Sequence, residues 1–355
     1  MCRFIFSLLF FIQFSISVIA QHEPNVTITK SKPRPDSNYI KSYKHYLTIG
    51  FFVATPITTL TLTPKDSTIK PTEYSTNLAS AIGFTGSYKS ISASFGFRTN
   101  PEADEKSKYG TTKYKSFSIG TQRTKFSIRF DYRKVSGFYN GDSIITIPNE
   151  PTTYFKRSDV TTKQYMLSGL YNFSWRKYSY QSSFLFTEHQ LKTRVGFIMK
   201  SSISLNRLQS DSSLINNTDK SATNSEKIQQ LNYTSFLVGP GMGLNVVIAK
   251  RVYFSLMIFY SIDFVTYTLI NNNNSTNTRD NSLTGFYEGR AALGYHSKRF
   301  YAGIKVVGDK IAVQTQDYKV ENTFGVLTLD IGYRFNAPGI LKKVYSKTLT
   351  RYLGL

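Results

Sequence analysis

The chain has 355 residues, with 44 Lys and Arg against 22 Asp and Glu and a formal net charge of +22 at pH 7. This basic balance indicates an anionic partner, yet no helix-turn-helix, zinc-finger or RNA-binding signature occurs, so nucleic acid is not expected among the partners. The only cysteine is Cys2, which excludes disulfides and zinc–thiolate sites from the rest of the chain.

The first residues predict export from the cytoplasm. Arg3 precedes an apolar run over 4–19, and a small residue, Ala20, stands before Gln21. These are the features of a secretory signal peptide, which we expect to span residues 1–20. Residues 21–42 are polar and contain several Pro and Lys, so we expect a flexible periplasmic lead-in there.

Residues 43–335 alternate between apolar and small or polar positions, which is the period-two pattern of β-strands. The 27 Phe and 25 Tyr, with scattered Gly and Ser, are typical of an outer-membrane barrel with an apolar outer band, aromatic girdles and a polar interior. We therefore predict an all-β fold, a transmembrane antiparallel β-barrel in the cell outer membrane. The predicted strands are 47–62, 76–88, 90–99, 111–121, 124–133, 162–175, 178–205, 236–249, 252–268, 283–296, 299–308 and 322–335.

The clearest hairpin is formed by residues 236–268, with a tight turn at Lys250 and Arg251. In its second strand Phe254, Leu256 and Ile258 share one face, and the opposite face carries small or polar residues. A transmembrane helix over 252–270 is the competing interpretation, since the run is long enough to span a bilayer. An internal acidic residue and many β-branched and aromatic residues favour the strand.

The number of strands depends on two places where the apolar residues switch between odd and even positions in the sequence. One lies after Pro56 and the other near residues 188–192. If each is a β-bulge within one strand the barrel has twelve strands, whereas fourteen result if each separates two strands. With twelve, the short turns lie near Lys89, Gln122, Arg176, Arg251 and Lys298, and the long loops, including 134–161 and 206–230, lie on the other side. Bacterial barrels have this arrangement, so twelve is the prediction.

Several stretches carry a family resemblance, among them YIKSYKHYLTIGFFVATPITTLTL, IGFTGSYKSISASFGF, FLVGPGMGLNVVIAKRVYFS and LDIGYRF. They resemble an uncharacterised family of Bacteroidota outer-membrane proteins, the domain of unknown function 4421, over about residues 38–335. The resemblance implies a β-barrel and a Bacteroidota origin but no activity. The basic tail, residues 336–355, departs from the family pattern. It forms either a short basic amphipathic helix on the inner leaflet or a disordered segment, and both remain open.

Catalytic chemistry is not indicated. A nucleophile needs a base within hydrogen-bond reach, and only His189, beside Glu188 and facing many serines, offers a candidate. The favoured interpretation is that His189 is an exposed polar residue at a strand end. No nucleophile elbow, zinc-binding helix motif or phosphate-binding loop stands in a suitable context. We therefore expect no enzyme, no cofactor and no metal.

In each predicted strand, the positions that alternate with the apolar outer residues face the lumen. They place twelve charged side chains there, eight bases and four acids. They are Arg98, Lys125, Arg129, Asp131, Arg133, Lys200, Asp263, Glu288, Arg290, Lys305, Asp330 and Arg334. Two functions follow from them. Paired charges would fill the lumen of a structural or accessory component of an outer-membrane complex, the favoured interpretation; unpaired bases would line a pore or binding barrel for anionic solutes.

The short turns predict a periplasmic girdle at the headgroups of outer-membrane lipids, with bases on phosphates and aromatic rings at the interface. The girdle residues are Lys89, Trp175, Arg176, Lys177, Lys250, Arg251, Lys298 and Arg299. Besides these lipids, other outer-membrane or periplasmic proteins are possible partners.

Overall fold

A computed structural model describes residues 34–66, 70–99, 102–146, 152–214, 228–271 and 278–346. The described residues from Pro35 onward form one compact unit. The predicted signal peptide, residues 1–20, and most of the predicted lead-in, residues 21–42, lie outside the described residues.

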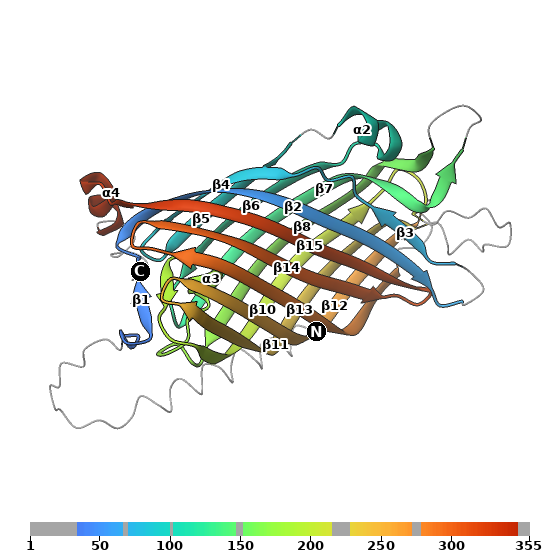
Figure 1. The fold of residues 1–355 in the computed structure, drawn as a ribbon. Coiled ribbons are helices and arrows are strands. Elements are labelled where there is room, and N and C mark those ends of the chain that lie inside the picture. The colour runs from blue at the N-terminus through green and yellow to red at the C-terminus, as the bar shows by residue number, and fades with distance from the viewer. Residues whose placement is uncertain are drawn as a thin grey trace, which may run out of the picture. The chain divides into compact units, whose positions relative to one another are not determined.

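Twelve antiparallel strands form a closed ring, as predicted (Figure 1). The ring closes because the last strand pairs with the first along their whole lengths, from Tyr46 opposite Asn336 to Pro64 opposite Tyr318. In order around the ring the strands are β2 (Tyr46–Pro64), β4 (Ala81–Tyr88), β5 (Ile91–Arg98), β6 (Lys113–Gln122), β7 (Phe126–Ile145), β8 (Thr153–Asn172), β10 (Arg194–Gln209), β11 (Ile228–Ala249), β12 (Val252–Asn271), β13 (Thr278–His296), β14 (Phe300–Gln314) and β15 (Tyr318–Asn336).

A few elements lie outside the ring. β3 (Thr72–Ser75) bridges β2 and β7 beyond the short strands β4, β5 and β6, while β1 (Ile40–Ser42) pairs with β9 (Glu188–Gln190) in a separate two-stranded sheet. The described helices are α2 (Ala103–Tyr109), α3 (Gln181–Phe184) and α4 (Gly339–Val344). None of these helices is both long and apolar enough to cross a membrane.

The two ends of the barrel differ in their connections. Tight turns join β4 to β5, β6 to β7, β11 to β12 and β13 to β14 at one end, here called the turn end. Residues 173–193 connect β8 to β10 at this end as well. The other end, the loop end, carries the connections that follow β2, β5, β7, β10, β12 and β14. In bacterial barrels the short turns face the periplasm.

The predicted alternation holds in the wall. On β12, Ile258 and Phe264 are exposed on the outer surface, whereas the intervening Phe259 and Asp263 are fully buried inside. The pairing of β11 with β12 through the turn at Lys250 and Arg251 matches the predicted hairpin. The wall therefore has an apolar outer face and a mixed inner face, as expected of strands that separate lipid from a lumen.

The bulge predicted after Pro56 is wrong. The register between β2 and β15 is continuous through Pro56, and Leu60 and Leu62, each 1% exposed, point into the barrel. The strand keeps its parity, and the interior itself becomes apolar towards the loop end. A buried interior face at that level prefers apolar side chains, so the sequence pattern inverts without an inserted residue.

The second predicted bulge, near residues 188–192, is also wrong. Residues 178–187 do not continue the wall strand; they turn into the barrel, form α3 and lead to β9, and the wall resumes only at Arg194.

Two further expectations need correction. Most of the predicted loop 134–161 belongs to the extended strands β7 and β8, and residues 40–42 of the lead-in form β1 instead of a flexible segment.

Candidate functional site in the barrel lumen

A segment here called the plug, residues 178–190, occupies the turn end of the lumen. Its side chains are buried or half-buried throughout, and α3 lies inside the ring of strands (Figure 1). Two glycines that face each other on β10 and β11, Gly196 and Gly243, admit the ring of Tyr178, because any side chain at either position would overlap it. These inward glycines thus make room for a segment of the chain itself.

Hydrogen bonds from the wall satisfy the backbone of the plug. Asn245 donates from its side-chain nitrogen to the Ser179 carbonyl (2.8 Å), and Arg334 donates to the Phe186 carbonyl (2.6 Å). The ring nitrogen Nε2 of His296 contacts the Ser182 carbonyl at 2.7 Å. Buried backbone carbonyls need such partners to stay inside a protein, so these wall residues specify the position of the plug.

The plug contains a bulky residue in a strained conformation. Phe186 has a φ of +57°, in the left-handed region that non-glycine residues rarely occupy. Its ring stacks on Tyr301 with centroids 4.3 Å apart, and Arg334 holds its carbonyl. Such a conformation persists only where the surroundings impose it, which indicates a firmly docked plug.

Glu188 ties the plug to the residues that precede the barrel. Its buried carboxylate pairs with Lys44 (2.7 Å) and accepts hydrogen bonds from Ser179 (2.5 Å) and Thr124. The backbone of β1 pairs with β9 directly beside it. The carboxylate is therefore occupied by structural contacts and does not activate a neighbouring group.

His189, the catalytic candidate considered from the sequence, is also buried within this network. Its Nδ1 lies 3.5 Å from the Tyr43 hydroxyl, and its ring stacks on His296 at 5.0 Å. Burial, followed by the positive charges of Arg334 and Lys41, lowers the pKa of His189 from 6.5 to about 4. The described contacts of the ring include no serine hydroxyl, so the geometry does not form the nucleophile–base pair that catalysis requires.

Above the plug, opposite charges pair along the inner wall. Lys200 on β10 and Arg290 on β13 share the carboxylate of Glu288, and all three side chains are largely buried. Lys305 on β14 pairs with Asp330 on β15 at 2.9 Å. Lys200 and Glu288 lie on strands that are not neighbours in the ring, so this ion pair crosses part of the lumen.

The bases of β7 follow the same pattern. Arg129 pairs with Asp131 on its own strand at 2.8 Å. Arg133 lies 3.4 Å above the ring of Phe324, which belongs to β15 on a distant part of the ring. Cation–π contacts of this kind stabilise a guanidinium where water is scarce. Of the two arginines on β7, Arg129 therefore contacts an acid on its own strand, and Arg133 contacts an aromatic ring across the lumen.

Two cavities remain between these contacts. One, of about 170 Å³, lies directly against the plug and is lined by Arg129, Lys200, Arg290 and Lys305 together with plug residues Tyr180 and Phe184. A second, of about 270 Å³, shares Arg129 and Lys305 and extends to Asp131, Arg133 and Phe324. The middle of the lumen is thus a charged chamber.

An apolar cluster fills the lumen at the loop end. It comprises Leu60, Leu62, Tyr74, Val135, Phe138, Val160, Leu208, Leu214, Ile228, Leu231, Tyr233, Val265, Tyr267, Val313, Tyr318 and Val320. These residues come from nearly every part of the ring, and the cavity of about 20 Å³ beneath them holds no more than a water-sized space. The interior of the barrel is therefore apolar at the loop end.

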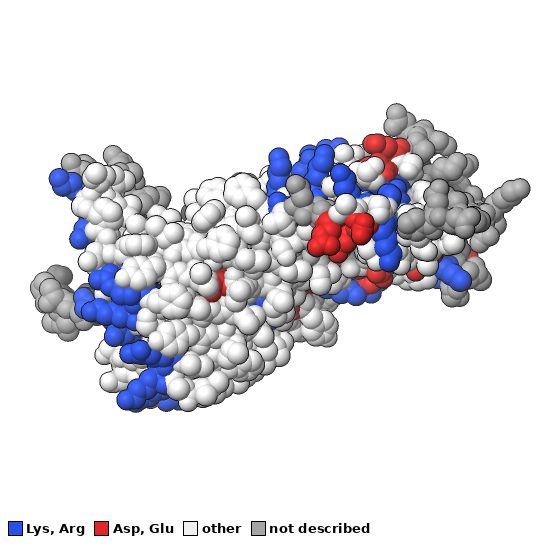
Figure 2. All heavy atoms as spheres, turned by 45° about the horizontal axis from the view of Figure 1, so that its top comes forward, with Lys and Arg blue, Asp and Glu red and all other residues white. Residues whose placement is uncertain are grey.

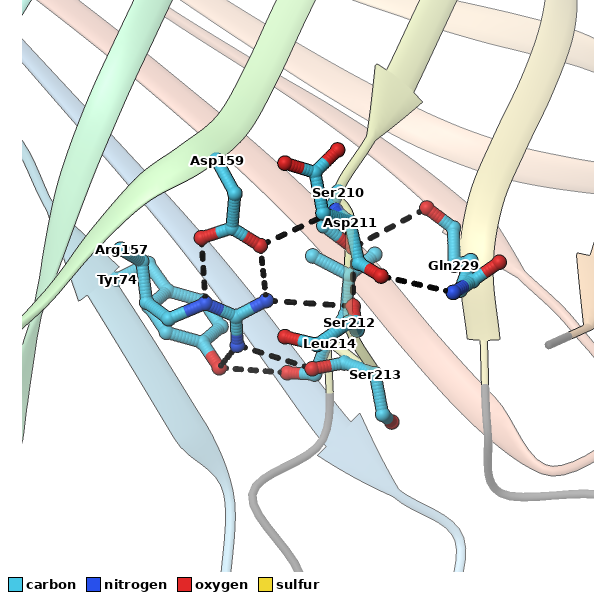
Figure 3. Close-up of polar contacts among 9 residues, drawn as sticks. All are labelled: Tyr74, Arg157, Asp159, Ser210, Asp211, Ser212, Ser213, Leu214 and Gln229. Carbon is cyan, nitrogen blue, oxygen red and sulfur yellow. Dashed lines mark hydrogen bonds and ion pairs between the residues drawn. The ribbon is translucent and has the colours of Figure 1, made fainter.

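A group of polar contacts, here called the latch, lies beside this cluster (Figure 3). Arg157, largely buried, forms a bidentate pair with Asp159 at 2.9 Å and donates to the Tyr74 hydroxyl (3.1 Å) and the Ser213 carbonyl (2.9 Å). Tyr74 in turn donates to the Leu214 carbonyl at 2.7 Å. The latch holds the segment that carries Leu214 over the mouth of the barrel.

The predicted lumen residues therefore face inward with one exception. Lys125 is exposed in the turn between β6 and β7, where its ammonium lies 5.4 Å from the ring of Tyr171 on the outer wall. The strand begins two residues later than predicted, at Phe126, so its alternation does not extend to Lys125. Arg98 contacts the Thr112 carbonyl at the loop end, and the buried Asp263 accepts a hydrogen bond from Ser235 (2.5 Å).

Some site residues were missed from the sequence. Asp309 lies on the inner face of β14, one residue beyond the end of the predicted strand. Arg157 and Asp159 fell within the predicted loop 134–161. Their i, i+2 spacing next to the apolar Val160 is a strand pattern, and this signal could have found them.

The predicted girdle residues all lie at the turn end, which shows as a basic collar beside a broad band nearly free of charge (Figure 2). Arg176 lies 5.6 Å from the Trp175 ring, and Lys177 lies 5.2 Å from the Tyr39 ring. Arg299 instead turns towards the barrel, donating to the Arg334 carbonyl at 2.9 Å. On the face shown in Figure 2, acidic and basic residues gather together towards the loop end.

The closed ring, the apolar outer wall and the charged interior define a transmembrane β-barrel of the outer-membrane type. The chain belongs to the family described as "Domain of unknown function (DUF4421)", whose model matches residues 34–335. None of the curated proteins matches the sequence.

Several solved structures have a similar chain trace at low sequence identity. The outer membrane protease OmpT from Escherichia coli is 8% identical, with a TM-score of 0.38 and coverage of 83% of this chain and 98% of that one. The outer-membrane expressed OmpT of Vibrio cholerae is 10% identical, with a TM-score of 0.28 and coverage of 84% of this chain and 100% of that one. The toluene transporter TodX of Pseudomonas putida is 8% identical, with a TM-score of 0.27 and coverage of 82% of this chain and 91% of that one.

Proposed function

We propose that this protein is a non-conducting barrel of the outer membrane that serves as a structural or accessory component of a larger membrane complex. The observation that carries the proposal is the plug, residues 178–190, which is built into the turn end by buried hydrogen bonds from Asn245, His296 and Arg334. A segment held by so many satisfied polar groups costs free energy to displace, so it does not open for passing solutes.

The interior above the plug supports the same function. Lys200, Arg290 and Lys305 find their carboxylates within the wall, and Arg133 finds an aromatic ring. These charges are compensated without a mobile anion. With the apolar cluster at the loop end, the lumen is interrupted at two levels, and the loops and the turn-end face remain as the surfaces through which the protein can act.

Electrical recording tests the absence of conduction. Purified protein is reconstituted in a planar bilayer, with insertion verified in parallel by heat-modifiable gel migration of the same proteoliposomes. We expect no steady channels. Steady anion-selective channels, lost in the double variant Arg129→Glu and Arg133→Glu, would overturn the proposal, because they require a continuous water path past those two side chains.

Crosslinking tests the accessory role. Photoreactive groups placed in vivo at exposed turn-end and loop-end positions, for example Lys298 and Arg279, should capture defined outer-membrane or periplasmic proteins. A matched group at Ile258, which faces lipid, serves as the control. A chain that crosslinks to no protein at either end would argue against a complex. The predicted signal peptide and the Bacteroidota origin stay predictions.

A second candidate function is the binding of a small anionic solute in the chamber. Four cations from separate strands, Arg129, Lys200, Arg290 and Lys305, line the cavity of about 170 Å³ next to the plug, and no carboxylate is among its lining residues. Equilibrium dialysis with inorganic phosphate or a small dicarboxylate tests it. Binding that is lost in Arg290→Gln would favour a binding barrel over a purely structural one.

A further inference from the structure

The C-terminal helix α4 packs on the outside of the barrel wall. Tyr345, which follows the helix, is buried against Tyr88, and Leu47, Ile91 and Leu341 pack around this pair. Leu47, Tyr88 and Ile91 have the outward parity of β2, β4 and β5. The helix therefore occupies the lipid side of the wall at the turn end, where Figure 1 shows it beside the ends of β4 and β5.

Specific contacts fix the helix at this height. The hydroxyls of Tyr345 and Ser90 are 2.7 Å apart, and the two tyrosine rings meet edge to face with centroids 5.5 Å apart. The ammonium of Lys89 lies 4.3 Å from the Tyr345 ring and 5.8 Å from the Tyr88 ring. The protein itself, through the turn between β4 and β5, thus sets the level of α4 along the barrel axis.

The rest of the helix presents two different faces. At about 100° per residue, Ile340 and Val344 share one face, and they are 78% and 52% exposed. Lys342 and Lys343 lie on another face and are exposed as well. Leu341 and Tyr345 occupy the face against the wall. An aliphatic face, a basic face and a docking face divide this short helix into three.

We propose that α4 is an interfacial anchor for the phospholipid leaflet at the turn end, with Ile340 and Val344 among the upper acyl chains and Lys342, Lys343 and Lys89 at the headgroup phosphates. The helix lies where the apolar outer wall begins: Ile49, the next outward residue of β2 after Leu47, is already well exposed on the lipid face. Amphipathic helices at such a boundary bury their apolar face by about 5–10 Å. The proposal does not depend on the plug or on the function of the lumen.

Two properties of the surface favour lipid over a protein partner. The exposed aliphatic pair borders directly on the lipid-facing wall, so a protein bound there would have to displace lipid from it. The adjacent cations complement phosphate, and such basic segments add electrostatic attraction to anionic leaflets. The helix thus restrains the strands at the closure of the ring, where β15 meets β2, relative to the leaflet.

Tryptophan quenching tests the anchor. The single native tryptophan is removed by Trp175→Phe, and Ile340→Trp is introduced into this full-length background. The protein is reconstituted in phosphatidylcholine vesicles that contain phosphatidylglycerol, with bromine atoms near the top, the middle or the end of the acyl chain. We expect a blue-shifted emission that is quenched most strongly by the shallow bromines.

Matched variants separate the contributions. Lys343→Trp, on the basic face of the same helix, should be quenched less than Ile340→Trp. Adding Tyr345→Ala to Ile340→Trp should reduce the quenching by releasing the helix, whereas Tyr345→Phe should retain it through the ring contacts. The double change Lys342→Ser and Lys343→Ser should reduce the salt dependence of the quenching.

Two results would overturn the proposal. Emission typical of water at position 340, without bromolipid quenching, would place the helix outside the membrane. Blue-shifted emission without bromolipid quenching would mean that protein covers the helix. Far-ultraviolet circular dichroism and heat-modifiable migration of each variant establish that the barrel is folded.

Discussion

A single arginine on the outer wall should destabilise the barrel according to its depth in the membrane. Ile258 lies on the outer face of β12 and is 54% exposed. It stands six residues beyond Val252, the first residue after the turn, which is about 20 Å along a strand at ~3.3 Å per residue. With a strand tilt of about 40°, its height above the turn is about 15 Å, close to the middle of an apolar band about 25 Å tall.

Ile258→Arg should therefore cost about 2–4 kcal/mol of unfolding free energy, the range for arginine at the midplane. Ile262→Arg, four residues further on the same face, lies about 10 Å higher, near the edge of the band, and should cost about 0–1 kcal/mol. The assay is urea unfolding of the protein folded into phospholipid vesicles, followed by tryptophan fluorescence. Ile258→Ala controls for loss of the aliphatic side chain.

Equal costs for the two arginine variants would refute this reasoning. The depth dependence follows from two assumptions, that the outer face of β12 meets lipid and that the turn between β11 and β12 marks the edge of the apolar band. If Ile258→Arg proved as mild as Ile258→Ala, the exposed face of β12 would be in contact with water or with another protein instead of lipid.

Three further outcomes are expected. Glu288→Gln, which leaves two buried cations without their shared carboxylate, should cost about 3–5 kcal/mol in the same urea assay, while Asp131→Asn, in a pair open to the chamber, should cost below about 1 kcal/mol; similar costs would contradict the burial argument. Gly243→Leu should expel the plug and expose its Tyr and Phe residues to chymotrypsin in proteoliposomes, whereas Gly289→Ala, with open space around it, should leave the digestion pattern unchanged. The folded pKa of His189 is about 4 against 6.5, so between these values the unfolded state binds more protons and stability should fall with decreasing pH by up to about 3 kcal/mol. His189→Gln should lose this part of the pH dependence, and an unchanged profile would assign it to other groups.

The wall of the barrel could be predicted from the sequence because its rule is local. Successive side chains of a strand point to opposite sides, so the alternation around Ile258 fixed which face meets lipid. The turn at Lys250 and Arg251 fixed the pairing of β11 with β12. The twelve strands followed from the lengths of the connections, and most of the inward charges followed from the same parity.

The interior depended on the tertiary structure. The sequence around residues 178–187 alternates well enough for a strand, and nothing local indicates that it leaves the wall. Only the glycines at 196 and 243, distant in sequence but paired across β10 and β11, create the space for Tyr178. The inversion of polarity after Pro56 likewise predicts a bulge, because the sequence does not show that sixteen apolar side chains from much of the ring meet at the loop end.

What the sequence by itself determined is therefore the wall: its strands, its two faces and the signs of the charges that point inward. What only the tertiary structure decided is the content of the lumen: which charges meet, which segment enters and where the helix after Phe335 docks. The physical reason is that alternation acts between adjacent residues, whereas Lys200 meets Glu288 and Arg334 meets Phe186 only after the ring has closed.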